Sequence, residues 1–440
     1  SLLILRMSAT ERQILRLVTA AASGEFKQVA VLPRTSSLKF NGLLTSSKHS
    51  EVTSLDSISN ADLIVVDNVL VSDGLVTKDG LQGGPLDSFL LSALTALNTG
   101  GILVVREDLS VHANPRVTLP SLTDYVDVFR RDIAGKYVGF DFYCAEQIDS
   151  SIHLAGNYLD FVWILRKKEF TPPAADAATV TFRDFLDKTQ YTNTGIGAYE
   201  WMFGKDFISP GGYDENIRVL EQFGGFKYGA KMLDIGSGIG GGVRQAAAVY
   251  GLQVTGVDLS ANMLSEAIVR VHDEKDSRVN YSICDAVTYD FGENVYDYIF
   301  SRDCIQHIPD QDTLFKNIYK SLKPGGVVLI TMYGKGKGAW TEAFKKYNDQ
   351  RFYHLQTLDE VKERALKHGF EAVHVENMTE RFREILTHER AHLEKEKADF
   401  FKNYTQAEFD SLYNGWSAKL KYIEADNHNW NLFRASKPAH

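Results

Sequence analysis

The sequence has little of several features that would assign a protein to a class at once. Three cysteines among 440 residues are too few for a disulfide framework, and Cys144, Cys284 and Cys304 lack the spacing of metal ligands. Such usage is typical of a reducing compartment. No run reaches the roughly 18 apolar residues of a membrane-spanning helix. The apolar start, from Ser1 to Arg6, is too short for a signal-peptide core, so we predict a cytoplasmic protein without a membrane partner.

An excess of positive charge is also missing. The 48 Lys and Arg residues are outnumbered by 57 Asp and Glu residues, which gives a net charge of -9 at pH 7. Because no basic stripe is present, a nucleic-acid surface is not expected, and nothing in the sequence indicates a protein partner. The length exceeds one ordinary core and suits two domains.

The first predicted domain covers residues 1–170. It contains short apolar runs of the kind that form strands buried on both faces of a parallel sheet. These runs are residues 28–32, 62–66, 101–105 and 160–165. A helical pattern over 86–97 stops at two glycines before the third run. We therefore predict an α/β, doubly wound (Rossmann-like) domain.

This first domain lacks the glycine turn that a nucleotide-type ligand loop needs. After the first predicted strand, residues 33–37 read Pro-Arg-Thr-Ser-Ser, which offers neither the backbone freedom nor the spare N–H groups of a ligand cradle. We predict a degenerate domain with a structural or regulatory role. Residues 171–180, rich in proline and alanine, are the predicted linker to a second domain over 181–440.

The second domain does have such a turn. Residues 231–235 predict a strand, a glycine cluster follows at once, and residues 243–250 have a helical pattern. Strand, glycine turn and helix bring backbone N–H groups at a helix N-terminus close to a ligand. Gly236, Gly238 and Gly240 permit the tight turn. Downstream, strands alternate with helices, which indicates a parallel doubly wound sheet.

The identity of the ligand is not fixed by the glycines alone. They also fit the G-x-G-x-x-G fingerprint of dinucleotide sites, with Asp258 about 20 residues further on. Asp234 and Asp285 favour S-adenosylmethionine, because its amino acid and sulfonium are compatible with carboxylates that would repel a pyrophosphate. An NAD-dependent oxidoreductase and a scaffold whose turn binds nothing are the alternatives.

Several motifs resemble those of class I S-adenosylmethionine-dependent methyltransferases. They are residues 234–240 (DIGSGIG), 256–258 (GVD), 301–307 (SRDCIQH) and 322–326 (LKPGG). More narrowly, the chain over about 182–437 is similar to the phosphoethanolamine N-methyltransferases. The runs that carry this are 190–192 (QYT), 199–204 (YEWMFG), 208–209 (IS) and 415–417 (GWS). A decayed first domain with an intact second resembles the nematode form, in which the C-terminal domain carries activity.

The resemblance implies a reaction and a fold. Methyl groups would pass from S-adenosylmethionine to phosphoethanolamine-type bases, chiefly the monomethyl and dimethyl forms. The products would be S-adenosylhomocysteine and phosphocholine, a step of phospholipid biosynthesis, and no metal is expected. The second domain would have a class I methyltransferase fold with extra helices over the active site. Another small-molecule amine methyltransferase is the alternative within this class.

The chemistry requires a proton acceptor, because an ammonium with a pKa near 10 is mostly protonated at neutral pH. The resemblance assigns this task to Tyr191, which would contact the amine, and to His307, which would orient the phenol and share its proton. Considered without the family, Tyr191 could be a lid aromatic that only excludes water. For His307 the alternative is a capping residue at a helix start before Pro309.

A phosphomonoester requires charge-assisted donors, for which bidentate arginine is best suited. By resemblance, the substrate-binding residues are Gln190, Tyr191, Tyr199, Arg302, Tyr333, Tyr347, Arg351, Tyr353 and Lys419. Tyr347 and Arg351 are four residues apart and would share one face of a helix. Without the family, residues 347–353 fit an ordinary surface helix, and Lys419 fits a solvated charge.

The resemblance also implies a donor site. Its residues would be Ile208, Ser209, Gly236, Asp258, Leu259, Asp285, Ala286 and Arg302. Asp258 would accept the ribose hydroxyls, and Asp285 would take the adenine amino group, although it could instead be a helix cap. The charge-rich run over 389–397 is predicted to be a solvated helical face.

Overall fold

The computed structural model divides into two compact units. They are Ser1–Val180 with Leu264–Tyr289, and Thr181–Met263 with Asp290–His440. The residues described are 7–40, 48–51, 54–77, 79–111, 121–130, 134–135, 137–149, 158–171 and 181–440. Residues 172–180 of the expected linker lie outside them. Segment 264–289, which chain order alone placed in the second domain, groups with the first unit.

The first unit is built on one mixed sheet with the strand order β11-β7-β8-β6-β3-β1-β2. The strands are β1 (Gln28–Leu32), β2 (Lys48–Glu51), β3 (Ala61–Asp67), β6 (Leu97–Asp108), β7 (Val138–Gln147), β8 (Asp160–Glu169) and β11 (Val279–Cys284). Strands β2, β1, β3 and β6 are parallel, whereas β8 is antiparallel to β6, and β7 is antiparallel to both β8 and β11. The four predicted apolar runs are all strands.

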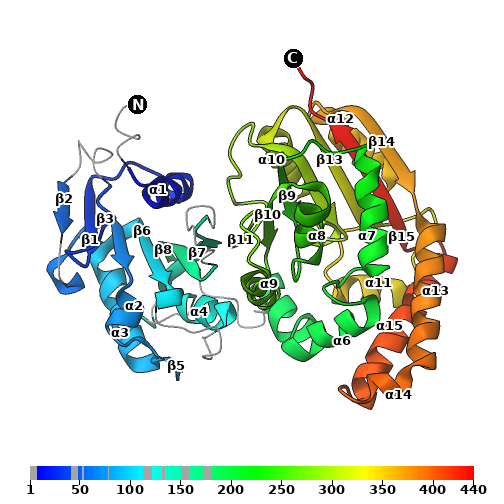
Figure 1. The fold of residues 1–440 in the computed structure, drawn as a ribbon, viewed down its shortest axis with the longest axis horizontal. Coiled ribbons are helices and arrows are strands. Elements are labelled where there is room, and N and C mark those ends of the chain that lie inside the picture. The colour runs from blue at the N-terminus through cyan, green and yellow to red at the C-terminus, as the bar shows by residue number, and fades with distance from the viewer. Residues whose placement is uncertain are drawn as a thin grey trace. The chain divides into compact units, whose positions relative to one another are not determined.

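Helices pack against this sheet (Figure 1). They are α1 (Ala9–Ala21), α2 (Val69–Ser72), α3 (Gly83–Ala96) and α4 (Leu122–Phe129), with the short turns η2 (Leu55–Ser57) and η3 (Leu109–Val111) and the small strands β4 (Val76–Thr77) and β5 (Gly80–Leu81). A capping box between Ser8 and Glu11 starts α1, since each side chain accepts a hydrogen bond from the backbone N–H of the other. Trp163 and Tyr125 are among the largest side chains of the buried core.

The sheet of the second unit has the order β14-β15-β13-β12-β9-β10. Its strands are β9 (Lys231–Ile235), β10 (Gln253–Asp258), β12 (Tyr296–Arg302), β13 (Leu322–Gly334), β14 (Glu371–Asn377) and β15 (Asn429–Ser436). The four strands from β13 to β10 are parallel, but β15 runs antiparallel to both neighbours. The expectation of a wholly parallel sheet was therefore wrong for β15, because an apolar run has the same pattern in either direction.

The helices of this unit fall into two groups. Those that connect strands are α8 (Gly241–Tyr250), α9 (Ala261–Glu274, which crosses into the first unit), α10 (Gln311–Ser321) and α12 (Leu358–Lys367). The others are α5 (Phe182–Phe185), η5 (Leu186–Gln190), α6 (Asn193–Phe203), α7 (Gly212–Leu220), η6 (Glu221–Phe223), η7 (Ile305–His307), α11 (Glu342–Gln350), α13 (Thr379–Lys395), α14 (Lys397–Phe400) and α15 (Gln406–Glu424). No helix in the described ranges combines the length and the apolar character needed to cross a membrane.

The extra helices of the second unit share an aromatic core. Helices α13 and α15 pack side by side (Figure 1), and α6 packs on α13. Their buried side chains form one cluster with those of α11 and strands β13 and β15, which includes Phe344, Phe382, Trp416 and Trp430. This cluster holds the helices over the end of the sheet at which β13 finishes.

Candidate active site

The glycine turn between β9 and α8 forms as the sequence predicts. Gly236, Gly238 and Gly240 have φ values of +79°, +58° and +83°, a region that side chains rarely enter. A Cβ at position 236 would also lie 2.5 Å from the side chain of Cys304, so this position accepts only glycine. The N–H of Gly238 donates to a carboxylate oxygen of Asp258 at 2.9 Å.

Two carboxylates lie beside this turn. Asp258 ends β10, and its second oxygen accepts from the N–H of Ser260 at 2.8 Å. Burial raises its pKa to about 6. Asp234 is 5% exposed, and burial, followed by the charge of Asp258, raises its pKa to about 7. The buried hydroxyl of Ser237 in the turn has no hydrogen-bond partner. The turn therefore offers acceptors and an unused hydroxyl to a polar ligand.

The two terminal nitrogens of Arg302 bind the start of α7 and the segment before it, whereas its buried Nε has no hydrogen-bond partner. Its guanidinium donates to the carbonyl of Pro210, to that of Gly212 at 3.5 Å and to the side chain of Asn216 at 3.3 Å. Burial lowers its pKa. Arg302 thus holds the loop that carries Ile208 and Ser209, whereas phosphate binding was also expected of it.

Ile208 reaches the glycine turn through apolar contacts. It packs in a cluster with Ile196, Ile239 and Met263, which Tyr191 also joins. A Cβ at position 238 would lie 2.9 Å from the Ile208 side chain. The loop therefore closes over the turn through van der Waals contact.

Glu389 is an exception to the expectation that residues 389–397 form a solvated face, whereas Glu394, Lys395 and Lys397 are exposed as expected. The Glu389 carboxylate is 7% exposed, and it accepts from the N–H of Gly211 at 3.1 Å and from the indole of Trp416 at 3.3 Å. Burial raises its pKa to about 7. The signal was present in the sequence, because Glu389 continues the apolar stripe of α13 that Phe382 and Leu386 begin.

Tyr191 is positioned by a turn of π-helix, η5, that is fixed to the end of β10. The carboxylate of Asp187 accepts from the hydroxyl of Ser260 at 2.5 Å, and the side-chain amide of Asn262 donates to the Tyr191 carbonyl at 2.9 Å. Gln190 donates to the Tyr191 hydroxyl at 3.1 Å. The ring of Tyr191 makes an edge contact with Tyr199, with centroids 6.0 Å apart. Burial raises the pKa of Tyr191.

His307 ends η7 with its ring stacked on Phe182 at 5.1 Å and tilted against Tyr353 at 5.1 Å. Its buried Nδ1 has no hydrogen-bond partner, and burial lowers its pKa to about 4. It does not cap the next helix, because Asp310 does so through the N–H of Thr313 at 2.9 Å. Within the described part of the chain, neither a hydrogen bond nor a ring contact joins His307 to Tyr191, so their pairing stays a prediction.

Asp303 is a site residue that sequence reasoning missed. One carboxylate oxygen accepts from the hydroxyl of Thr331 at 3.0 Å and from the indole of Trp430 at 2.6 Å. The other, buried, has no hydrogen-bond partner and lies 3.9 Å from Nε of Arg302. Burial raises the pKa of Asp303. Its signal was its place directly after β12, as Asp258 ends β10.

Two cations occupy the aromatic cluster. The Arg351 guanidinium lies 4.7 Å from the ring centroid of Tyr347, and the Lys419 ammonium lies 5.5 Å from that of Tyr333. No carboxylate among the residues described forms an ion pair with either cation. Lys419 is 9% exposed, and burial, followed by the charge of Arg351, lowers its pKa to about 7.

Tyr353 joins these groups into one cluster. Its ring centroid is 5.7 Å from that of Tyr333 and 6.1 Å from that of Tyr347. The phenol of Tyr353 lies beside that of Tyr347 and beside the guanidinium of Arg351. Of the six residues expected to hold a phosphate, all but Arg302 therefore lie in one cluster. The alternatives, an ordinary surface helix for 347–353 and a solvated charge for Lys419, do not describe these positions.

Asp285 and Ala286 follow β11 and belong to the first unit. The Asp285 carboxylate accepts a hydrogen bond from the N–H of Val287 at 2.9 Å. The backbone carbonyl of Asp285 accepts one from the N–H of Tyr289 at 2.9 Å. Asp285 thus caps a turn, and no helix begins in the residues described directly after it, so it is not the helix cap that the sequence alone left as the alternative. A role of either residue in adenine binding stays a prediction.

The strand order of the second unit and its glycine turn are those of a nucleotide-type fold with a ligand at the carboxyl ends of the strands. Residues 212–375 match a family model described as a methyltransferase domain. The second unit is a class I S-adenosylmethionine-dependent methyltransferase domain. This confirms the methyl-donor interpretation of the glycine turn over the dinucleotide one.

The particular family follows from relatives that span most of the chain. Residues 8–171 match a model described as Phosphoethanolamine N-methyltransferase 2 N-terminal. Phosphoethanolamine N-methyltransferase 2 of Caenorhabditis elegans is 54% identical over 391 residues, which cover 89% of this chain and 87% of that protein. The chain belongs to the phosphoethanolamine N-methyltransferase family.

Solved structures and a shorter relative agree with this assignment. Phosphoethanolamine N-methyltransferase 2 of Haemonchus contortus, in complex with phosphomonomethylethanolamine and S-adenosylhomocysteine, superposes with a TM-score of 0.89 at 46% identity. The aligned region covers 98% of this chain and 100% of the Haemonchus chain. The phosphoethanolamine N-methyltransferase of Plasmodium falciparum is 34% identical over 258 residues, which are 58% of this chain and 96% of that protein.

Proposed function

We propose that this protein transfers methyl groups from S-adenosylmethionine to phosphomonomethylethanolamine and phosphodimethylethanolamine, ending in phosphocholine. The observation that carries the proposal is a pair of cations, the partly buried Arg351 and the buried Lys419, which have no carboxylate partner in the described chain. Near them lies the carboxylate of Asp303, one oxygen of which has no hydrogen-bond partner. This distribution of charge complements a ligand with a phosphate at one end and an ammonium at the other.

The phosphate of the substrate would be bound by the two cations. Removing a cation from water costs several kcal/mol unless an anion or hydrogen bonds offset it. A phosphate dianion would neutralise Arg351 and Lys419 through charge-assisted hydrogen bonds. The phenols of Tyr333, Tyr347 and Tyr353 surround the same place and would donate the remaining hydrogen bonds.

The amine end requires a free lone pair in line with the methyl group and its sulfur. S-Adenosylmethionine supplies the electrophilic methyl group. Asp303 would hold the substrate ammonium through its second carboxylate oxygen, and Tyr191 would contact the amine. His307, neutral because burial lowers its pKa to about 4, would orient the phenol and relay to water the proton that the amine releases, since so weak a base does not keep it. Gln190 and Tyr199 would orient the Tyr191 ring.

The residues at the glycine turn fit the donor. A carboxylate oxygen accepts more than one hydrogen bond, so Asp258 can receive ribose hydroxyls beside its two backbone donors. The unpartnered hydroxyl of Ser237 is a further polar contact. Because Gly236 has no side chain, the donor can approach the backbone of the turn. Ile208, Ser209 and Leu259 would cover the donor. We assign Arg302 to holding the 208–212 loop rather than to the phosphate, because its donors already bind protein carbonyls.

The relatives support this choice of substrate, since the Haemonchus structure contains phosphomonomethylethanolamine. The test is an assay of labelled methyl transfer to phosphoethanolamine and to its monomethyl and dimethyl forms, each supplied separately. We expect turnover of the monomethyl and dimethyl forms, and none of the same amines without phosphate. Equal turnover of the phosphate-free amines would contradict the role of Arg351 and Lys419. Turnover of no phosphobase would refute the proposal.

A further inference from the structure

His428 is a buried histidine to which the reaction described above gives no task. It lies between α15 and β15, and its exposed fraction is 0%. Neither ring nitrogen makes a hydrogen bond of normal geometry, although the backbone of Asn429 lies near enough to favour the protonated ring. The loop around it is fixed, because the N–H of His428 donates to the carbonyl of Tyr422 at 3.1 Å and Asn427 donates to that of Ala339 at 3.1 Å.

The ring borders the cluster that holds the two free cations. Its centroid is 4.8 Å from that of Tyr333, 6.1 Å from that of Tyr353 and 5.7 Å from that of Phe382. Burial, followed by the positive charges of Lys419 and Arg351, lowers the pKa of His428 to about 3. The imidazole is therefore neutral, with one N–H donor and one acceptor nitrogen.

Packing alone does not explain a histidine at this position. Its neighbours are aromatic rings, for which phenylalanine would be an equal partner in packing. A buried polar atom without a hydrogen-bond partner costs roughly 1–3 kcal/mol. Unpartnered ring nitrogens beside two cations without a carboxylate partner indicate that a bound ligand supplies the missing interactions.

We propose that His428 is a phosphate-binding residue, whose imidazole N–H donates to a phosphate oxygen of the phosphobase beside Arg351 and Lys419. The inference rests on the proposed function and adds a residue to its phosphate end. A neutral donor suits this place, because a third buried positive charge would be repelled by the two cations when no phosphate is bound. The second ring nitrogen would accept from a neighbouring phenol, such as that of Tyr333.

The test compares His428→Phe with His428→Gln in the full-length protein. Phenylalanine keeps the ring packing and removes both nitrogens, whereas glutamine keeps a donor and an acceptor. Hydrogen bonds to charged groups contribute about 1.5–3 kcal/mol, so we expect His428→Phe to raise the KM for phosphomonomethylethanolamine by roughly 10- to 100-fold. The KM for S-adenosylmethionine should stay unchanged, and His428→Gln should recover part of the loss.

A stability measurement separates this role from a structural one. Because His428→Phe removes two unsatisfied nitrogens, its Tm should equal or exceed that of the wild type. The control is Phe382→Leu, which loosens the same cluster without touching a polar group. It should lower Tm while leaving the phosphobase KM within a few-fold.

The experiments distinguish a failure of the proposed function from a failure of the role proposed for His428. Wild-type protein that turns over no phosphobase would overturn the proposed function and this inference with it. Wild-type turnover together with an unchanged KM in His428→Phe would overturn the inference alone. Should His428→Phe not fold, His428→Leu, which also lacks a hydrogen-bond donor, takes its place in calorimetry with phosphocholine, and an affinity equal to that of the wild type would count against the proposal.

Discussion

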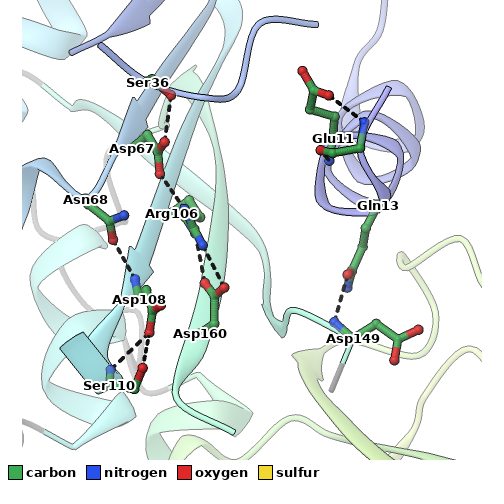
Figure 2. Close-up of polar contacts among 11 residues, drawn as sticks. Glu11, Gln13, Ser36, Asp67, Asn68, Arg106, Asp108, Ser110, Asp149 and Asp160 are labelled. Carbon is green, nitrogen blue, oxygen red and sulfur yellow. Dashed lines mark hydrogen bonds and ion pairs between the residues drawn. The ribbon is translucent and has the colours of Figure 1, made fainter. Parts of the chain in front are cut away.

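The carboxyl ends of the parallel strands are built in opposite ways in the two units. In the first unit, Arg106 forms ion pairs with Asp67 and Asp160, both at 2.8 Å, and the hydroxyl of Ser36 donates to Asp67 at 2.6 Å (Figure 2). In the second unit, Arg351 and Lys419 have no carboxylate partner among the residues described. The first unit thus neutralises its own charges at this place. In the second unit, Arg351 at the end of α11 and Lys419 of α15 stay without a carboxylate partner, and we propose that they bind the substrate phosphate.

The difference shows how one fold can carry a structural core or a binding site at the same edge. A buried arginine with two carboxylates occupies the place where a ligand lies in related sheets, and its hydrogen bonds leave few groups unused. Buried atoms without a hydrogen-bond partner remain on Tyr125, Trp163 and Glu107, in Glu107 one carboxylate oxygen. Burial raises the pKa of Glu107 to about 8, which keeps it protonated at neutral pH. The comparison is consistent with the prediction that the first domain has no working ligand loop.

The largest effect is expected when both cations of the second unit are removed. Each charge-assisted hydrogen bond contributes about 1.5–3 kcal/mol, so Arg351→Met with Lys419→Met should lower kcat/KM for the phosphobase by roughly 10²- to 10⁴-fold. The Tm should stay level or rise, since two unpaired buried charges disappear. Steady-state kinetics and thermal unfolding check both halves. A strong loss of stability would mean that the cations are structural.

Arg106→Met should have the opposite effect: it should lower the stability of the protein and leave catalysis unchanged. Removing one partner of a buried ion pair leaves uncompensated charge, which costs about 3–5 kcal/mol, and here Asp67 and Asp160 would both be left. Denaturant unfolding should show the loss, while the phosphobase KM of the folded fraction should not change. Arg166→Met is the matched control, because its ion pair with Asp141 is about one-third exposed on both sides and should contribute at most about 1 kcal/mol.

The sequence predicted the frame of both units because their central strands are short apolar runs between glycine or helix signals. It missed β7, in which Asp141, Phe142 and Tyr143 are consecutive half-buried residues without alternation. The sequence also did not show that β15 is antiparallel, because the orientation of a strand depends on the end of the sheet at which the preceding helix finishes.

The site was predictable where a motif carried it and not elsewhere. Tyr347, Arg351 and Lys419 were identified through the family resemblance, and they meet as expected. Asp303 and His428 were missed, because the burial of a single polar residue is decided by elements far away in the sequence. Glu389 was partly readable, since it continues the apolar stripe of α13.

Asp303→Asn tests the amine end of the same comparison. The amide keeps the acceptor for Thr331 and Trp430 but loses the charge that would hold the substrate ammonium. We expect kcat/KM to fall by about 10- to 100-fold, in line with 1.5–3 kcal/mol for a charged hydrogen bond, with little change in binding of inorganic phosphate. Kinetics and phosphate calorimetry measure the two. Equal losses in both would place Asp303 outside the amine end.

The smallest effect, and the sharpest contrast with Arg106, is in the pH dependence of Lys419. Its pKa of about 7 makes it cationic below pH 7 and increasingly neutral above, whereas an arginine stays charged throughout. Affinity for phosphocholine should therefore fall from pH 7 to pH 9, by at most about tenfold per pH unit. Calorimetry is the measurement, and phosphocholine is chosen because its amine does not titrate. Lys419→Met should bind weakly and evenly over this range, and Lys419→Arg should bind well and evenly.

The same titration must appear in the stability of the ligand-free protein, with a sign that can be worked out. The unfolded chain holds the Lys419 proton up to about pH 10.4, but the folded chain releases it from about pH 7. The unfolded state thus binds more protons between these values, and stability rises with pH there. Lys419→Met should lose this rise, and Arg351→Met should keep a weaker one shifted upward in pH, because one positive neighbour of Lys419 is gone. A wild-type slope equal to that of Lys419→Met would show that the lysine is already paired, and the contrast between the two edges would then fail.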